Sequence, residues 1–157
     1  ALATFFCIGK NVVQHPEIYD RILNEKHSVG NHTYNHNNGW KTTNDDYIND
    51  VRKASEIIHS NLFRPPYGKI RKVQAKQITD ILGQRAKIIM WDVLSADFDQ
   101  SVSEKKCLQN IMENVSAGSI IVFHDSEKAF ANLKYALPRT LEKLTEQGYE
   151  FKRVEGL

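Results

Sequence analysis

The sequence has only two cysteines, Cys7 and Cys107, and neither belongs to a CxxC pair or has a histidine close by in the chain. Two isolated cysteines give no sign of a disulfide framework or of a zinc-finger pattern. Cys7 lies in a strand-like run and Cys107 in a helix-like one, where a thiol packs as a small apolar side chain. This pattern favours two buried thiols over a disulfide or a pair of metal ligands.

The sequence also lacks an excess of charge of either sign and any long apolar run. Its 21 lysines and arginines nearly balance its 19 aspartates and glutamates. This balance gives little reason to expect nucleic acid or an anionic membrane surface as the partner. No apolar run approaches the roughly 20 residues that a membrane-spanning helix needs, so we expect no membrane span in this chain.

Neither an initiating methionine nor a secretory leader is visible, because the sequence begins inside the apolar run 1–8. A protein that starts in the middle of a strand would be unusual, so we expect further sequence upstream, with any targeting segment in it. Repeats, low-complexity tracts and Pro/Gly/Ser linkers are absent as well. The length is that of one domain, and we expect a single domain over residues 1–157 that is incomplete at its N-terminus.

What is present is an alternation of β-prone runs and helical patterns. Strands are predicted at 4–8, 28–31, 62–64, 87–91, 119–123 and 149–154. One helix is predicted to begin near Pro16, and two more to begin at capping boxes, Thr43 with Asp46 and Ser101 with Glu104. Strict β/α alternation with short connections predicts parallel strands, hence an α/β fold that is either a doubly wound sheet or a β/α barrel.

Four polar side chains fall at or just after the ends of four predicted strands. They are His32, Arg64, Asp97 and His124. In parallel α/β folds the functional groups collect beyond the carboxyl ends of the strands. The sequence therefore predicts that these residues belong to a functional site.

His32 and His36 lie four residues apart after the second predicted strand. This spacing places two imidazoles on one face of a helical turn, where their nitrogens can converge on one divalent metal. The pair alone is a weak signal, and by itself it favours surface or capping histidines over metal ligands.

Two further motifs also follow predicted strands. Arg64-Pro65-Pro66-Tyr67-Gly68 stiffens the chain directly after an arginine and then permits a sharp turn, which is typical of a rigid strand exit as well as of a site. The run 91–98 places two acids and two aromatic residues at another strand end, and a turn that leads into a helix would explain it equally well.

The two-residue period of a strand places Val122 and His124 on the same face of the run 119–123 and its end. If this face points inward, His124 is a candidate general acid or base above an apolar wall. A histidine that merely ends a buried strand is the alternative. Tyr34, Trp40 and Tyr67 could offer flat faces to sugar rings, although core packing explains Trp40 equally well.

Together these segments form five motifs in a fixed order: Ala3-Thr4-Phe5-Phe6, His32-Thr33-x-x-His36, Arg64-Pro65-Pro66-Tyr67-Gly68, Ser95-x-Asp97-Phe98 and Val122-x-His124-Asp125. In this order and spacing they resemble the motifs of the NodB-type polysaccharide deacetylases, carbohydrate esterase family 4. The resemblance covers essentially the whole chain. It implies a distorted β/α barrel, here without its first strand, that removes N-acetyl or O-acetyl groups from peptidoglycan, chitin-like sugars or exopolysaccharide in the cell envelope.

The resemblance also implies roles, position by position. His32 and His36 would be the two histidine ligands of one divalent metal, zinc in the first place and cobalt or nickel otherwise. Arg64 would orient the catalytic base, and the backbone N–H of Tyr67 would help to hold the oxyanion. In the same way, His124 would be the general acid with Asp97 as its charge partner. The substrate pocket would be lined by Phe98, Val122 and Tyr34.

One departure from the family pattern is an absence. The family's first motif, an Asp-Asp pair that supplies the catalytic base and the third metal ligand, has no counterpart in the 157 residues. We expect either part of a longer active enzyme or a non-catalytic carbohydrate-binding domain that keeps the groove; a metal-binding structural domain is more remote. The metal site of the chain alone would then be weak, and the strand at 4–8 would present an open edge that invites pairing with another chain.

Overall fold

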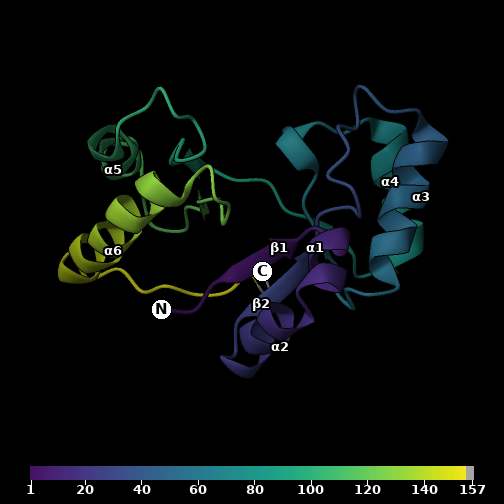
Figure 1. Cartoon of the computed structure of the whole chain (residues 1–157), viewed down its shortest axis with the longest axis horizontal. Coiled ribbons are helices and arrows are strands. Elements are labelled where there is room, and N and C mark those ends of the chain that lie inside the picture. Colours follow the sequence, from purple (N-terminus) through teal and green to yellow (C-terminus); the bar gives the residue numbers. More distant parts are fainter. Residues whose placement is uncertain (155–157) are drawn as a thin grey trace. The chain divides into compact units, whose positions relative to one another are not determined.

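The computed structural model describes residues 1–154 and divides into two compact units (Figure 1). The N-terminal unit consists of Leu2–Met90 together with residues 152–154, and the C-terminal unit consists of Trp91–Phe151 with Ala1. Each unit combines helices with parallel strands, so the α/β class predicted from the alternating pattern is confirmed.

The N-terminal unit is built on a four-stranded parallel sheet with the strand order β1-β2-β3-β4. Its strands are β1 (Thr4–Cys7), β2 (Ser28–Asn31), β3 (Leu62–Phe63) and β4 (Lys87–Ile88). Gly30 lets β1 and β2 pack closely, because a Cβ atom there would lie 2.5 Å from the Phe6 ring. Within residues 1–154, β1 is one of the two edge strands of this sheet, as the sequence predicted for the run 4–8.

Helices of the N-terminal unit cover this sheet, and α3 and α4 pack side by side (Figure 1). They are α1 (Gly9–Gln14), α2 (Pro16–Asn24), α3 (Asn44–Ser55) and α4 (Lys72–Leu82), with a single 3₁₀ turn at Pro66–Gly68. The predicted starts of two helices are confirmed: α2 begins at Pro16, and the Thr43 hydroxyl caps α3 by accepting the N–H of Asp46 at 3.2 Å.

Two apolar clusters form the core of the N-terminal unit. The first joins α3, β3 and α4 through Tyr47, Ile48, Val51, Phe63 and Ile78. The second joins α1, β2 and α3 through Val12, Val29, Ala54 and Ile58. Because both clusters use α3, this helix is fixed on two sides, and the loop that follows β2 packs against a rigid support.

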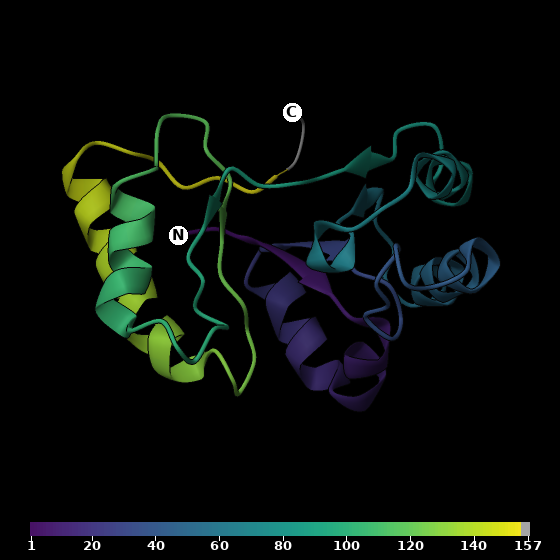
Figure 2. The same ribbon diagram turned by 90° about the horizontal axis from the view of Figure 1, so that it is seen from above.

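The C-terminal unit contains one pair of parallel strands and two helices (Figure 2). The strands are β5 (Val93–Leu94) and β6 (Ile121–Val122), and the helices are α5 (Glu104–Met112) and α6 (Phe130–Glu146), which pack against each other. Cys107 and Ile111 of α5 are buried, as are Ala136 and Leu144 of α6. Neither cysteine of the chain forms a disulfide within the described residues, as expected, although Cys7 is only half-buried.

Several predicted elements differ from the structure. The run 149–154 is not a strand. The N–H of Val154 donates to the Thr4 hydroxyl at 2.8 Å, and the Arg153 side chain donates to the carbonyl of Lys26. These hydrogen bonds involve side chains, whereas a strand would form backbone-to-backbone hydrogen bonds. The capping box at Ser101 is wrong, because Ser103 caps α5. Helix α1 was not predicted, since its six residues are too few to show a period.

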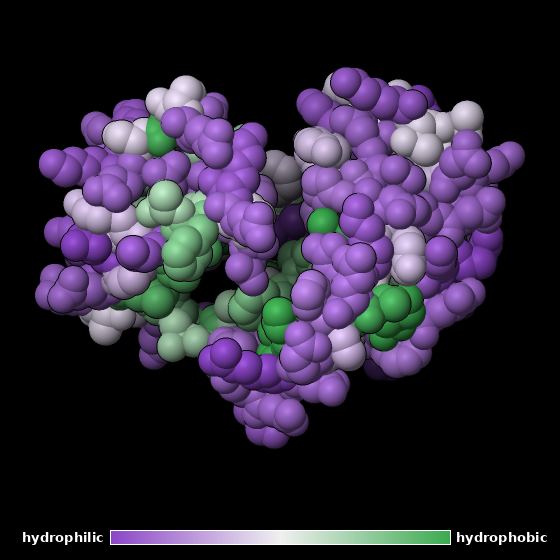
Figure 3. Space-filling model, viewed as in Figure 1, coloured by the Kyte–Doolittle hydropathy of each residue, from purple (hydrophilic) through white to green (hydrophobic). Residues whose placement is uncertain are grey.

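Most of the surface visible in Figure 3 is hydrophilic, and apolar residues gather around α6. Phe130, the first residue of α6, is 58% exposed. None of the helices in residues 1–154 is both long and apolar enough to cross a bilayer.

Candidate functional site

His32 follows the last residue of β2 and is held by main-chain groups. Its N–H donates to the carbonyl of Cys7 at 3.0 Å, and its Nδ1 lies 2.6 Å from the carbonyl oxygen of Arg64. A carbonyl can only accept, so Nδ1 carries the proton and Nε2 is the basic nitrogen of the ring. A histidine held in this way is typical of a metal ligand, whose other ring nitrogen usually donates to a carbonyl or carboxylate.

The ring of His36 lies beside that of His32, with centroids 4.9 Å apart. The expectation that a helical turn joins them is wrong, because residues 32–36 contain no helix and the chain bends at residues 34 and 35. Thr33 and His36 have φ angles of 63° and 61°, in the left-handed region that non-glycine residues rarely adopt. These two residues reverse the chain within a few positions, and so bring the imidazoles together without a helix.

The bend between the two histidines is held from both sides. On one side, the N–H groups of Gly9 and Lys10 at the start of α1 donate to the carbonyls of Thr33 and Tyr34. On the other side, the buried carboxylate of Asp50 in α3 accepts the N–H of Tyr34 at 3.1 Å. It also accepts the N–H and side-chain amide of the next residue at 2.9 and 2.6 Å. The positions of the histidine rings therefore depend on two helices.

Tyr67 closes this group of rings. Its ring centroid lies 4.7 Å from that of His36, and its hydroxyl lies 3.3 Å from Nδ1 of that histidine. Tyr67 itself has φ 59°, directly before Gly68 at φ 66°. Left-handed backbone at a tyrosine costs roughly 1–3 kcal/mol and persists only where the surrounding structure imposes it. His32, His36 and Tyr67 thus form a continuous group of rings in the N-terminal unit.

Arg64 directly follows β3, and its side chain contacts backbone carbonyls and an aromatic ring. Its Nε donates to the carbonyl of Ile89 at 3.1 Å and its Nη2 to that of Met90 at 3.0 Å, and its guanidinium lies 4.1 Å above the Phe6 ring centroid. Burial lowers the pKa of Arg64 to about 10. The side chain therefore links the end of β3 to the residues that follow β4, while the carbonyl of Arg64 fixes His32.

The C-terminal unit holds a second histidine in a different way. Nδ1 of His124 lies 2.8 Å from the carboxylate of Asp97, and the backbone N–H of His124 donates to the other carboxylate oxygen, also at 2.8 Å. The hydroxyl of Ser95 donates to the same carboxylate at 2.9 Å. Asp97 is fully buried, whereas 39% of the His124 side chain is exposed. A buried acid thus fixes the tautomer of a histidine whose Nε2 side faces outward from the pair.

Two apolar residues accompany this pair. The ring of Phe98 meets that of His124 edge to face, with centroids 4.8 Å apart, and Val122 is buried at the end of β6. Ala96, which lies directly before Asp97, has φ 62°. The side-chain amide of Asn132 in α6 donates to the carbonyl of Asp97 at 3.1 Å. The loop that carries the acid is therefore strained and is fixed by the neighbouring helix.

Tyr34, which was predicted to line the substrate pocket, packs within the N-terminal unit. Its ring contacts the second apolar cluster, and Nζ of Lys53 lies 3.8 Å from its centroid. A Cβ atom on Gly9 would lie 2.7 Å from the Tyr34 ring, so the tyrosine fits closely over α1. The structure brings the rings of His32, His36 and Tyr67 together. Tyr34 lies between the two histidines in the sequence, and its side chain is half-buried.

The two histidines of the bend suit an ion that prefers imidazole, such as zinc. They supply only part of a donor set: no group of three or more His, Cys, Asp or Glu side chains in residues 1–154 could hold a metal ion. Two imidazoles bind a divalent metal weakly on their own. The described residues therefore provide two ligands and not a complete metal centre.

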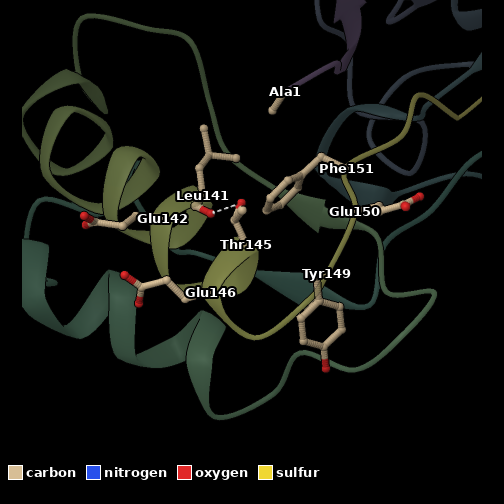
Figure 4. Close-up of a pocket in the computed structure, with 8 residues that line it drawn as sticks. All are labelled: Ala1, Leu141, Glu142, Thr145, Glu146, Tyr149, Glu150 and Phe151. Atoms are coloured by element: carbon tan, nitrogen blue, oxygen red, sulfur yellow. Dashed lines mark hydrogen bonds between the residues drawn. The ribbon is translucent and has the colours of Figure 1, made fainter.

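A hollow of the C-terminal unit lies beside the end of α6 (Figure 4). It is lined by the turn from Leu141 to Glu146 and by the chain that follows, including Tyr149 and Phe151. Thr145 does not offer its hydroxyl to the hollow, because it donates to the carbonyl of Leu141 at 2.7 Å. The residues predicted to carry chemistry do not line this hollow.

The fold and the two histidine sites define an α/β protein with a pair of neighbouring imidazoles and a separate carboxylate–imidazole pair, and comparison with known proteins places it in a family. The model of the polysaccharide deacetylase family matches residues 1–86, more than half of the chain. The chain belongs to the polysaccharide deacetylase family. The resemblance inferred from the order of motifs is thereby confirmed.

Individual relatives agree. A peptidoglycan-N-acetylglucosamine deacetylase of Bacillus cereus is 35% identical over 162 residues, which cover 99% of this chain and 58% of that protein. The crystal structure of the Bc1960 peptidoglycan N-acetylglucosamine deacetylase matches with a TM-score of 0.88 at 33% identity, over 98% of this chain and 73% of that one. The chain thus spans little more than half the length of the first relative. The structural match confirms the predicted α/β fold of the NodB-type deacetylases.

Another similar structure is that of a CE4 family pseudoenzyme from Bacillus anthracis, BA3943. It matches with a TM-score of 0.83 at 28% identity, over 98% of this chain and 54% of that one. Members of the same structural family therefore include both deacetylases and a pseudoenzyme.

Three residues that support the site were not singled out from the sequence. They are Asn31, Asp50 and Asn132, which bond to the backbone or side chains around the two histidine sites. Asp50 had a detectable signal, because it lies three residues after Tyr47 and one before Val51, on the buried face of α3. A carboxylate on a buried helix face needs partners, and here they are the N–H groups of the bend.

Proposed function

We propose that this protein is part of a metal-dependent deacetylase that hydrolyses N-acetyl, or O-acetyl, groups of a polysaccharide such as peptidoglycan, a chitin-like oligosaccharide or exopolysaccharide. The observation that carries the proposal is the Asp97–His124 pair in a chain of the polysaccharide deacetylase family. The substrate is an acetylated glycan, and the place of action is the cell envelope or another extracytoplasmic site. Residues 1–157 form most of the deacetylase domain.

His124 is the general acid of this proposal. In amide hydrolysis the oxygen of water bonds to the acetyl carbon, the C–N bond breaks, and the amine leaves only after it takes up a proton. Nδ1 of His124 is engaged by Asp97, so Nε2 is the atom that would deliver this proton. Asp97 would stabilise the imidazolium formed when the ring is protonated, as the acid does in Ser-His-Asp triads.

Metal binding and stabilisation of the oxyanion are assigned to residues that follow β2 and β3. His32 and His36 would be two ligands of a divalent metal, zinc in the first place, with cobalt or nickel as alternatives. Such a metal, when bound, supplies an activated water and polarises the acetyl carbonyl. The backbone N–H of Tyr67 would donate to the oxyanion, since donors are needed where negative charge develops.

Binding of the acetyl group is assigned to apolar side chains. Phe98 packs edge to face on His124, so the methyl of an acetyl group could rest against its ring while the amine nitrogen approaches Nε2. Val122 is proposed as the floor of this pocket and Tyr34 as a side-chain contact of the sugar. Arg64 would position the catalytic base, which the 157 residues do not include.

Acetate release from acetylated chito-oligosaccharides and from peptidoglycan fragments tests the proposal. The protein is assayed in its longest native form, with and without added zinc or cobalt. Release that depends on the metal is expected. Absence of release by the metal-loaded protein on all of these glycans would overturn the enzymatic proposal.

A second candidate function is a non-catalytic carbohydrate-binding domain. Two observations favour it: the residues described supply only two metal ligands, and a similar structure belongs to a pseudoenzyme. Glycan binding measured by calorimetry, together with complete absence of acetate release, would establish this alternative.

A further inference from the structure

Trp40 lies in the loop that precedes α3, and 57% of its surface is exposed. The main chain of this loop is nevertheless fixed by two side chains from the start of α4. Arg71 donates to the carbonyls of Trp40 at 2.7 Å and Thr42 at 2.8 Å, and the buried amide of Gln74 donates to the carbonyl of Gly39 at 2.9 Å. An exposed side chain is thus presented by a rigid loop.

The indole ring itself is also held in one orientation. Its Nε1–H donates to the carbonyl of Ile70 at 3.2 Å, and Nζ of Lys69 lies 4.2 Å from the ring centroid. The polar edge of the indole is therefore satisfied and one face is covered by a cation. More than half of the residue remains exposed, which leaves the opposite face for a ligand. Because the ring is already ordered, binding to that face loses little conformational entropy.

The position of Trp40 relates it to the histidine pair of the same unit. Trp40 lies four positions after His36, which limits the distance between their Cα atoms to about 14 Å. Tyr67, whose ring lies 4.7 Å from that of His36, is two residues from Lys69 in sequence. Trp40 therefore lies within the span of a short oligosaccharide from the proposed metal ligands.

We propose that the open face of Trp40 is a stacking site for a pyranose ring of an oligomer of N-acetylated amino sugars. The inference rests on the proposed function, because it supplies a contact for a sugar beyond the one that is deacetylated. The C–H groups on one side of a pyranose form an apolar face that packs on a flat aromatic ring. The chain would consequently distinguish an oligomer from a single amino sugar.

Calorimetric titration of the 157-residue chain with the tetramer of N-acetylglucosamine and with the monosaccharide tests this site. Trp40→Ala should weaken binding of the tetramer about tenfold, a change that corresponds to about 1.4 kcal/mol, and leave binding of the monosaccharide unchanged. Trp40→Phe keeps a flat ring and should restore most of the affinity. The matched control is Phe130→Ala, which removes an equally exposed aromatic ring from α6 and should change neither affinity.

A second readout reports on the indole directly. In a Trp91→Phe background Trp40 is the only tryptophan, and its fluorescence should change with the tetramer and not with the monosaccharide. Equal tetramer affinity of the parent chain and Trp40→Ala, with melting temperatures that agree, would overturn the stacking site. Both measurements are independent of turnover. Absence of acetate release together with a Trp40-dependent tetramer affinity would therefore overturn only the proposed function.

Discussion

The two units hold a histidine in contrasting ways. In the N-terminal unit Nδ1 of His32 donates to a neutral carbonyl, that of Arg64, whereas in the C-terminal unit Nδ1 of His124 meets the buried carboxylate of Asp97. A carbonyl orients the ring without adding charge, which suits a neutral ligand of a metal. A carboxylate also stabilises the imidazolium, which suits a group that carries a proton. The difference teaches that the hydrogen-bond partner of Nδ1 indicates the role of a histidine better than the position of that histidine in the sequence.

The strongest test of this comparison replaces each histidine in turn. His124→Ala should lower acetate release by about 10²–10⁴-fold, the usual contribution of a general acid, and leave zinc binding unchanged. His32→Ala should abolish both release and zinc binding, because one imidazole remains. Zinc affinity is followed by calorimetry. An equal loss of zinc binding in the two variants would contradict the division of tasks.

Asp97→Asn should have the next largest effect. Asparagine keeps the shape of aspartate but has only one oxygen that accepts hydrogen bonds. That oxygen cannot accept from the ring of His124, the backbone N–H of His124 and the hydroxyl of Ser95 together. The free energy of unfolding should fall by about 1–3 kcal/mol, because a buried donor loses its partner. Release should fall by about 100-fold, since the ring loses its fixed tautomer. Chemical denaturation and acetate assays measure the two effects.

Asp99→Asn is the matched control, because Asp99 is a less buried acid two residues further on. Hydrogen bonds from the hydroxyl and then the N–H of Ser101 lower the pKa of Asp99. Its ionised form therefore contributes stability above its unfolded pKa of about 3.9, and this contribution is lost as the pH falls through the lower folded value. The control should change stability slightly at neutral pH and leave turnover intact. A loss of turnover equal to that of Asp97→Asn would show that the buried acid has no special part.

A smaller effect is expected when the support of the bend is removed. Asp50→Ala deletes three hydrogen bonds to residues 34 and 35 and should weaken zinc binding about tenfold, as is usual for groups that orient metal ligands. Asp45→Ala removes an exposed acid of the same helix and should have no such effect. The measurement is zinc affinity beside thermal stability. Unchanged zinc affinity in a folded Asp50→Ala protein would show that the bend holds the histidines unaided.

The smallest effect concerns backbone strain beside Asp97. Ala96→Gly removes the penalty of a φ of 62° and should raise the free energy of unfolding by about 0.5–1 kcal/mol. Ala75→Gly, at an equally half-buried position inside α4, should lower it by about 1 kcal/mol, because glycine is a poor helix former. Chemical denaturation compares the two. A decrease in both variants would mean that the left-handed conformation at Ala96 carries no strain.

The local and periodic features of the fold could be predicted from the sequence. The α/β class followed from alternating patterns, the start of α2 from Pro16, and the cap of α3 from Thr43 with Asp46, because each depends on residues close together in the chain. The failures have the same origin. The run 149–154 is as β-prone as a strand, but its backbone and side chains bond to Thr4 and Lys26, far away in sequence.

By itself, the sequence determined the family and the candidate residues, because the order and spacing of short motifs are properties of the chain. Only the tertiary structure decided how His32 and His36 meet, through left-handed residues and the carboxylate of Asp50 rather than a helical turn. It also decided that one histidine faces a carbonyl and the other a buried acid. The physical reason is that a ring's tautomer and a bend's geometry are set by hydrogen bonds to residues 15 or more positions away, which no local pattern encodes.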